Sequence, residues 1–344
     1  MTVKIISRTE LGPSSFDHQF STIQRRVRKA PYDKGNYPEQ VWHGMLQIPK
    51  PEKKEFFMAE VDSQLVGRIG TNMATSYPGK GYVGFFEVDV SHPESDAIAK
   101  ALLESAKDWL KKEGAEECIG PMNYNTWFAY RFRVDNPQDQ IFLWEPINPP
   151  EYVNYFKSFG MESLEIYQSR CSDKNEKVAL STEKSYKKAL EHGFSFSPFE
   201  GEDFLLKNME SLFKLSLMGF SKNYLYEPIS FPEFQALYVP IFKAFDFSTG
   251  HLAKNDKGDI VAFCFSFKDG QNLVVKSIVV DPEYQGKGLS NALLHLCSKE
   301  AVRQGLIDFI GALFKKESIS GNNLSVKSEV LWEHEYHLFS KKIT

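Results

Sequence analysis

The chain has 344 residues, which is long for one domain and natural for two. Hydrophobic residues make up 42% and charged residues 25%, as in ordinary globular proteins, and the formal charge of −4 argues against a nucleic-acid partner. No apolar run reaches transmembrane length and the first residues lack a signal-peptide core, so we expect a cytoplasmic protein with no membrane partner. The four cysteines form no CxxC pair, which predicts reduced thiols and no zinc site: Cys118, Cys171, Cys264 and Cys297.

The first half of the chain predicts a complete unit of strands and helices. Asp62-Ser63-Gln64 marks a hairpin between two strands, and an apolar stripe at helical spacing marks a helix that ends before Gly114. In chain order we expect a strand at 3–7, a helix at 16–30, strands at 55–61, 65–72 and 82–90, a helix at 95–112, a strand at 117–120, a helix at 151–158 and a strand at 161–168.

A polar segment at 171–184 separates the two halves. No apolar periodicity crosses it, so we place the domain boundary near Ser172 and expect a short connecting helix from Ser181 to His192, closed by Gly193. The sequence therefore predicts a first domain at 1–171, a linker at 172–193 and a second domain at 194–344.

The second half predicts another unit of the same kind. Its hairpin turns at Asn255-Asp256-Lys257-Gly258. In chain order we expect a strand at 194–199, helices at 203–220 and 231–245, strands at 250–253, 260–268 and 273–280, a helix from Leu289, a strand at 306–314, a short helix at 322–327 and a strand at 332–340.

The strand predicted at 273–280 leads into a glycine turn and then a helix. Val280-Asp281-Pro282 ends the strand, and Gly286-Lys287-Gly288 forms the turn. A strand, a glycine turn and a helix aim several backbone N–H groups at one anion. We therefore interpret residues 285–290, named here the glycine loop, as a phosphate-binding loop.

Two common phosphate motifs do not fit the glycine loop. A P-loop requires a GxxxxGK[ST] run, which is absent, and a dinucleotide motif requires a third glycine where Asn291 stands. The pattern that fits is Gln/Arg-x-x-Gly-x-Gly/Ala after a V-x-P strand end. It closely resembles the acetyl-CoA signature of the GNAT N-acetyltransferase superfamily, with Ser290 in place of the usual Gly or Ala. The alternative is a plain strand-to-helix turn.

This resemblance implies the fold, the reaction and the co-substrate. The implied fold class is α/β (α+β), with two tandem GNAT-like domains, each a mixed, mostly antiparallel sheet flanked by helices. The implied activity is transfer of an acyl group from acetyl-CoA to an amine of a small molecule or peptide, catalysed by the C-terminal domain without a metal. The residues that the resemblance assigns to CoA are Ile278, Val280, Gln285, Gly286, Lys287, Gly288, Leu289, Ser290 and Asn323.

The first half lacks a glycine at the corresponding link between strand and helix. Residues 89–96 contain Pro93, and Glu94 and Asp96 would occupy the positive end of the helix dipole and repel a phosphate. We therefore expect the first domain to be GNAT-like without a CoA site.

The acid and base of the reaction are harder to identify. Many relatives carry a carboxylate on the central strand, where this chain has Lys276 and Ser277, and many carry a tyrosine in the final helix, which this chain lacks. Tyr336 is the nearest candidate acid. The neighbouring Glu333, His334, Glu335 and His337 alternate along an expected strand, so they do not converge on a metal.

Acceptor-side candidates come from two places. The GNAT resemblance places Tyr224 and Tyr226, between the first two helices of the second domain, near the acceptor, although packing tyrosines fit equally well. The segments at 120–127 and 145–152 resemble blocks of uncharacterised bacterial two-domain GNAT-like proteins. They offer four pocket residues, although turn chemistry explains the asparagines better: Asn123, Tyr124, Asn125 and Asn148.

Two other functions remain open. The missing carboxylate and tyrosine favour a protein that binds CoA or an acyl chain without turnover. Transfer of a longer acyl chain or of an aminoacyl group is a third hypothesis.

Overall fold

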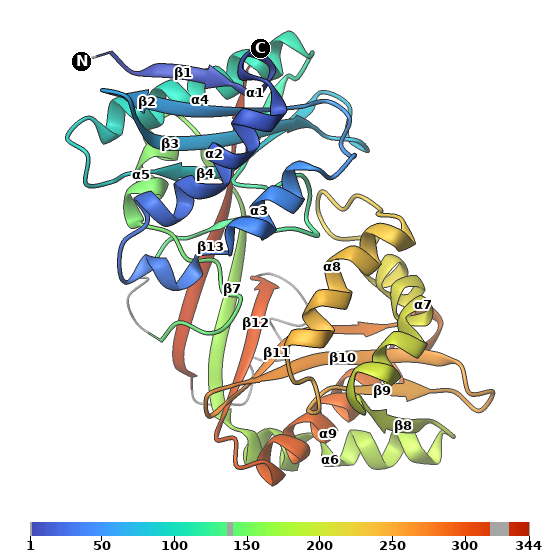
Figure 1. The fold of residues 1–344 in the computed structure, drawn as a ribbon. Helices are drawn as coiled ribbons and strands as arrows, with labels where there is room; N and C mark the ends of the chain where they lie inside the picture. The colour runs from blue at the N-terminus through green and yellow to red at the C-terminus, as the bar shows by residue number, and fades with distance from the viewer. Residues whose placement is uncertain (1, 136–139, 317–329, 344) are drawn as a thin grey trace. The chain divides into compact units, whose positions relative to one another are not determined.

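The structure, a computed structural model, describes residues 2–135, 140–316 and 330–343. It contains two compact units, each with a sheet covered by helices (Figure 1). Unit 1 comprises Met1–Ile166 with Glu335–Thr344, and unit 2 comprises Tyr167–His334. Two long strands, β7 (Glu162–Lys174) and β13 (Val330–Lys342), each contribute residues to both units.

The sheet of unit 1 has the strand order β1-β2-β3-β4-β5-β13, and β6 pairs with β13. Among its described pairs, β4 and β5 are parallel and the others are antiparallel. The strands not yet given are β1 (Lys4–Ser7), β2 (Lys54–Val61), β3 (Gln64–Met73), β4 (Lys80–Val88), β5 (Glu117–Gly120) and β6 (Phe132–Arg133).

Helices cover both faces of this sheet, as the alternation along β2 requires. Phe56 and Met58 pack against α2 and α3, whereas Phe57 and Ala59 lie in the core formed with α4 and α5. The helices of unit 1 are α1 (Arg8–Leu11), α2 (Pro13–Val27), the 3-10 turn η1 (Tyr32–Gly35), α3 (Glu39–Leu46), α4 (Ser95–Lys112) and α5 (Pro150–Ser158).

Unit 2 repeats this plan with the strand order β7-β12-β11-β10-β9-β8, in which β11 and β12 are parallel. Its other strands are β8 (Ser195–Pro198), β9 (His251–Lys254), β10 (Ile260–Asp269), β11 (Asn272–Val280) and β12 (Asp308–Lys315). Its helices are α6 (Asn175–Glu191), α7 (Gly201–Phe220), α8 (Phe231–Ala244), the 3-10 turn η2 (Pro282–Tyr284) and α9 (Leu289–Arg303). Helices α6 and α9 share one core, and α8 packs aromatic rings against Phe265 of β10.

The predicted fold class is confirmed, because both sheets are mixed, mostly antiparallel and flanked by helices. The division of the chain differs from the sequence prediction. The C-terminal residues from Glu335 onward belong to unit 1, and the segment expected as a linker at 172–193 is the end of β7 and helix α6. Its polarity is misleading because Asn175 and Thr182 are buried and hydrogen bonded.

Within the described ranges, no helix combines the length and the apolarity needed to cross a bilayer.

Candidate functional site

Strands β11 and β12 pair along only part of their length. The parallel register runs from Asn272 opposite Asp308 to Val275 opposite Gly311, but β11 continues to Val280. An extra residue in β11 also shifts its register against β10 at this point. The edge of β11 at 277–280 that faces away from β10 therefore has no strand partner in the described part of the chain, and its backbone can bind an extended ligand.

The glycine loop follows this open edge. Gly286 and Gly288 have φ values of 77° and 81°, the left-handed region that favours glycine, and Gly288 caps α9 without a side-chain hydrogen bond. Within the described ranges, the amides of residues 286–291 donate to no protein acceptor. These amides stand at the positive end of the helix dipole, so the loop suits a negatively charged group.

The side chains of the loop leave it accessible. Lys287 is exposed, with its Nζ 4.6 Å from the ring centroid of Tyr284, and Gln285 Nε2 lies 3.5 Å from the carbonyl oxygen of Val280. Ser290 is exposed, whereas Leu289 is buried and anchors the start of α9. The side chains of Ile278 and Val280 are half-buried against the core shared with α9.

These features fit an acyl-CoA molecule. Its pantetheine arm carries amides that can pair with a strand edge, and its pyrophosphate can accept hydrogen bonds from the glycine loop. A Cβ added at Gly286 would meet nothing within 4 Å, and one added at Gly288 would meet only Ser185, at 3.8 Å. No protein atom therefore packs closely against either glycine at its Cβ position.

The opposite face of β11 is backed by α7. A Cβ on Gly219 of α7 would lie 2.3 Å from Val279 Cγ1, so this helix approaches the strand very closely. Tyr224 and Tyr226, the predicted acceptor-side residues, lie half-buried in the segment that joins α7 to α8. Burial raises the pKa of Tyr226 to about 12. Both tyrosines belong to the unit that holds the glycine loop.

The structure does not bring Tyr336 into that unit. Tyr336 lies in the part of β13 that belongs to unit 1, where it is buried and donates a hydrogen bond of 2.5 Å to Glu145. The sequence places this residue in the second domain, whereas the last strand pairs with β5 of unit 1. Asn323, predicted to contact CoA, lies outside the described residues, as does the short helix expected at 322–327.

The other predicted pocket residues are also in unit 1 and serve packing. Asn123 Oδ1 accepts the amide of Phe85 at 2.6 Å, and Tyr124 is buried with its hydroxyl donating to the Met45 carbonyl at 2.7 Å. Asn148 Oδ1 accepts the amide of Arg133 at 2.8 Å. The side-chain oxygens of both asparagines thus bind backbone, but the backbone of strands β4 and β6 and not of a local turn.

In unit 1 the two parallel strands β4 and β5 also pair along only part of their length, but side chains of the protein bind the unpaired edge of β4. The parallel pairing stops at Tyr82 opposite Ile119, while β4 continues to Val88. Asn123 Oδ1 accepts a hydrogen bond from the amide of Phe85, and the Tyr152 hydroxyl accepts one from the amide of Val88 at 3.0 Å. The segment between β4 and α4 also uses its own side chains. Asp89 accepts a hydrogen bond from the amide of Ser91, and His92 accepts one from the amide of Glu94.

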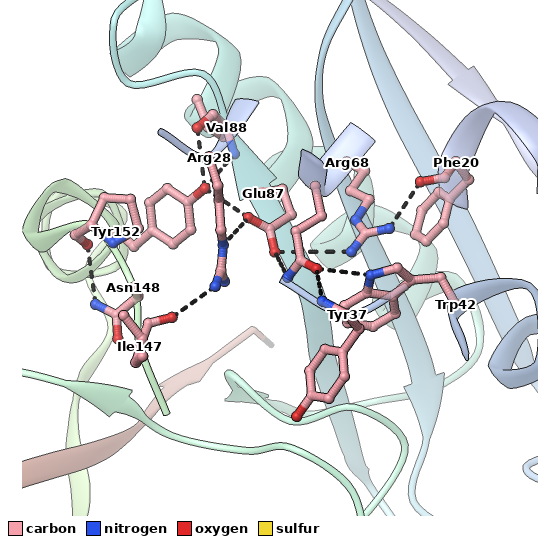
Figure 2. Close-up of polar contacts among 12 residues, drawn as sticks. Phe20, Arg28, Tyr37, Trp42, Arg68, Glu87, Val88, Ile147, Asn148 and Tyr152 are labelled. Carbon is pink, nitrogen blue, oxygen red and sulfur yellow. Dashed lines mark hydrogen bonds and ion pairs between the residues drawn. The ribbon is translucent and has the colours of Figure 1, made fainter. Parts of the chain in front are cut away.

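Sequence reasoning missed a buried charged cluster at the end of β4 (Figure 2). The Glu87 carboxylate, 2% exposed, accepts hydrogen bonds from Arg28 Nε at 2.8 Å, Gln24 Nε2 at 2.9 Å and Tyr152 at 3.0 Å. The available signal was a glutamate inside an otherwise apolar strand, because such a charge must find partners.

Arg68 completes this cluster from β3. Its guanidinium lies between the rings of Phe20 and Trp42, at 4.8 and 4.2 Å, and its Nη2 is 3.9 Å from Glu87. Burial lowers the pKa of Arg68 to about 10, although Glu87 opposes this change. The cluster holds two guanidinium groups and one carboxylate, and each of these three groups has protein partners, so we interpret it as structural.

The acidic and histidine residues of β13 have protein partners. Glu333 contacts Arg170 and Gln168, and His337 contacts Glu335 and Ser163. Among the residues that the structure describes, no group of three or more His, Cys, Asp or Glu side chains is arranged to hold a metal ion.

Comparisons with known proteins point to one family. The profile of the acetyltransferase (GNAT) family matches residues 18–131 and 217–319. A search of curated proteins found no significant match.

Several solved structures share the fold. A tandem GNAT protein from the clavulanic acid biosynthesis pathway is 10% identical, with a TM-score of 0.56, and the match covers 100% of this chain and 99% of that one. A GCN5-related N-acetyltransferase from Anabaena variabilis is 8% identical, with a TM-score of 0.59 and coverage of 100% and 73%. A fungal multi-domain GH3 β-N-acetylglucosaminidase with a glucosamine N-acetyltransferase region is 12% identical, with a TM-score of 0.58, and the chain spans 38% of its length.

Proposed function

The chain belongs to the acetyltransferase (GNAT) family, and we propose that it is an acyl-CoA-dependent N-acyltransferase whose donor, acetyl-CoA, binds to unit 2. The acceptor is an amine of a small molecule or a peptide. One observation carries the proposal: within the described ranges, the amides of residues 286–291 have no protein acceptor, and they follow a strand edge without a partner. The matching edge of unit 1 is filled by its own side chains, which favours unit 2 as the donor site.

Each residue of the site has a proposed task. The main chain at Ile278 and Val280 binds the pantetheine arm, and the amides from Gly286 to Ser290 hold the pyrophosphate, with Lys287 adding a positive charge. Acetyl-CoA supplies an acyl group activated as a thioester. Tyr224 and Tyr226 line the acceptor side. Holding the two reactants in one orientation provides much of the rate.

Binding of acetyl-CoA to Gly288→Glu and Gly258→Glu variants tests the donor site. Both glycines have positive φ, 81° and 86°, so each substitution strains the backbone similarly, but Gly258 lies in the hairpin between β9 and β10. We expect acetyl-CoA to raise the melting temperature of the wild type and of Gly258→Glu, and not of Gly288→Glu, because the new carboxylate repels the pyrophosphate. Absence of binding by any CoA ester to the wild type would overturn the proposal, as would unchanged binding to Gly288→Glu.

One observation favours binding without turnover as a second candidate. Val280 and Val88 end their strands in the same way, since the next residue in each case donates its amide to the neighbouring strand. The residue before Val88 is Glu87, whereas the residue before Val280 is Val279, packed against Gly219. Unit 2 thus has an apolar side chain where unit 1 has a carboxylate.

Release of CoA separates these two functions. The wild type is incubated with acetyl-CoA and a panel that contains a polyamine, amino acids, an aminoglycoside and a short peptide. Steady CoA release above the rate without amine supports the transferase. Tight acetyl-CoA binding with no release for any amine supports the binding protein. Competition of acetyl-CoA with long-chain acyl-CoA esters then defines the acyl chain that the site prefers.

A further inference from the structure

Helix α6 runs alongside α9, the helix that begins at the glycine loop (Figure 1). Near the start of α6, Asn175 donates to the Leu306 carbonyl, beyond the end of α9. Farther along, Tyr186 stacks on His295 with ring centroids 4.9 Å apart, and a Cβ on Gly288 would lie 3.8 Å from Ser185 Cβ. The second half of α6 therefore lies beside the first turn of α9.

This contact places two lysines beside the glycine loop. Lys188 is three residues after Ser185 and shares its helix face, and Lys184 is four residues before Lys188. Both are exposed, and neither forms an ion pair within the described part of the chain. Lys187, between them in sequence, is paired with Glu183 at 2.8 Å. The two lysines thus add positive charge to the part of α6 that approaches Gly288.

The CoA molecule carries a further phosphate, on the 3′ position of its ribose, beyond the pyrophosphate. In the proposed donor site the pantetheine arm lies along β11 and the pyrophosphate at the glycine loop, so the adenosine end follows beyond the loop, where Gly288 faces Ser185 of α6. Lys184 and Lys188 are then available to bind this phosphate. A lysine ammonium group acts on a phosphate as a point charge.

We propose that Lys184 and Lys188 bind the 3′-phosphate of the donor, so that α6 selects free CoA esters over carrier-bound phosphopantetheine, which lacks this group. The inference rests on the proposed donor site. It assigns a specificity role to a helix that lies between β7 and β8 in the chain.

Binding constants for three donors test this proposal: acetyl-CoA, acetyl-3′-dephospho-CoA and S-acetyl-4′-phosphopantetheine. We expect the wild type to bind acetyl-CoA about 5- to 10-fold more tightly than the dephosphorylated ester, the range that two exposed charge pairs allow. The double variant Lys184→Gln/Lys188→Gln should reduce this ratio to about 1–2 while binding the dephosphorylated ester like the wild type. Raising the salt concentration should also reduce the wild-type ratio.

Lys187→Gln is the matched control, because it removes one charge from the same helix and should leave the ratio unchanged. Unchanged melting temperatures without ligand confirm that the variants fold. A wild-type ratio near 1, or a double variant that keeps the wild-type ratio, overturns the role of α6 and leaves the proposed donor site standing. Absence of binding by all three donors overturns both.

Discussion

The hydroxyl of Tyr152 contacts both backbone groups of Val88. It accepts the Val88 amide at 3.0 Å, and its proton is shared between the Val88 carbonyl at 3.1 Å and the Glu87 carboxylate at 3.0 Å (Figure 2). Val88 ends β4 as Val280 ends β11. In unit 1, therefore, the Tyr152 side chain binds the backbone position whose counterpart in unit 2 is proposed to bind the donor.

Tyr152→Phe removes this bond while keeping the ring. We expect a loss of about 1–3 kcal/mol in stability, because the Val88 amide and Glu87 lose a buried partner. Hydrogen exchange of the Val88 amide should become faster, which localises the effect. Tyr32→Phe is the control, since Tyr32 is only half-buried, and its effect should stay within about 0.5 kcal/mol. Equal exchange rates at Val88 in Tyr152→Phe and the wild type would contradict the assignment.

The approach of α7 to β11 depends on Gly219. The Gly219→Ala methyl would meet Val279 Cγ1 at 2.3 Å, and a valine is too stiff at χ1 to move aside freely. We expect a loss of about 1–3 kcal/mol in urea denaturation. Adding Val279→Ala should recover part of it, so the double variant is more stable than the sum of the single effects predicts.

Gly44→Ala provides the control for this experiment. Gly44 is also in a helix, but its Cβ would meet nothing within 4 Å. This substitution should be neutral or stabilise the protein by up to about 1 kcal/mol, because alanine favours the helix. Strictly additive effects of Gly219→Ala and Val279→Ala would show that the two residues do not interact.

The regular elements and the glycine loop are predictable from the sequence because each has a local signal. Alternation identifies the hairpin strands, apolar spacing identifies α4, and Gly286 and Gly288 adopt the left-handed conformation that their residue type suggests. The prediction does not contain the short helices α1 and α3 and the strand β6, although the capping box of Ser7 and Glu10 is a local signal for the start of α1.

The errors concern partners that are distant in sequence. Tyr336 was assigned to the second domain by its position in the chain, but β13 pairs with β5, more than two hundred residues earlier. The pairing of Glu87 with Arg28 and Arg68 likewise joins three elements and leaves no local pattern. The periodicity of apolar residues indicates which face of a segment is buried, but it does not indicate which other segment packs or pairs with it.

Tyr336→Phe separates the structural role of this residue from a role in the donor site. The lost hydrogen bond to the buried Glu145 should cost about 1–3 kcal/mol in stability. Acetyl-CoA affinity should remain within about twofold of the wild type, because the residue belongs to unit 1. A large loss of affinity in a variant that is still folded would instead return Tyr336 to the donor site.

Lys54, at the start of β2, gives the protein a specific pH dependence. Burial, and then the charge of Arg8, lower the pKa of Lys54 from 10.5 to about 8. Between these two values the unfolded chain binds the proton and the folded chain does not, so raising the pH favours the folded state. Below pH 8 both states are protonated, and the cost of holding the charge in the folded protein is constant.

Lys54→Met should therefore flatten the rise in stability between about pH 8 and 10.5, as measured by urea denaturation at a series of pH values. The neighbouring Lys53 is the control: its side chain is 62% exposed and its Nζ is 3.1 Å from Glu113. Lys53→Met should leave the slope in this window unchanged, because Lys54 and its surroundings stay in place. Equal slopes for Lys54→Met and the wild type would mean that Lys54 keeps its ordinary pKa in the folded protein.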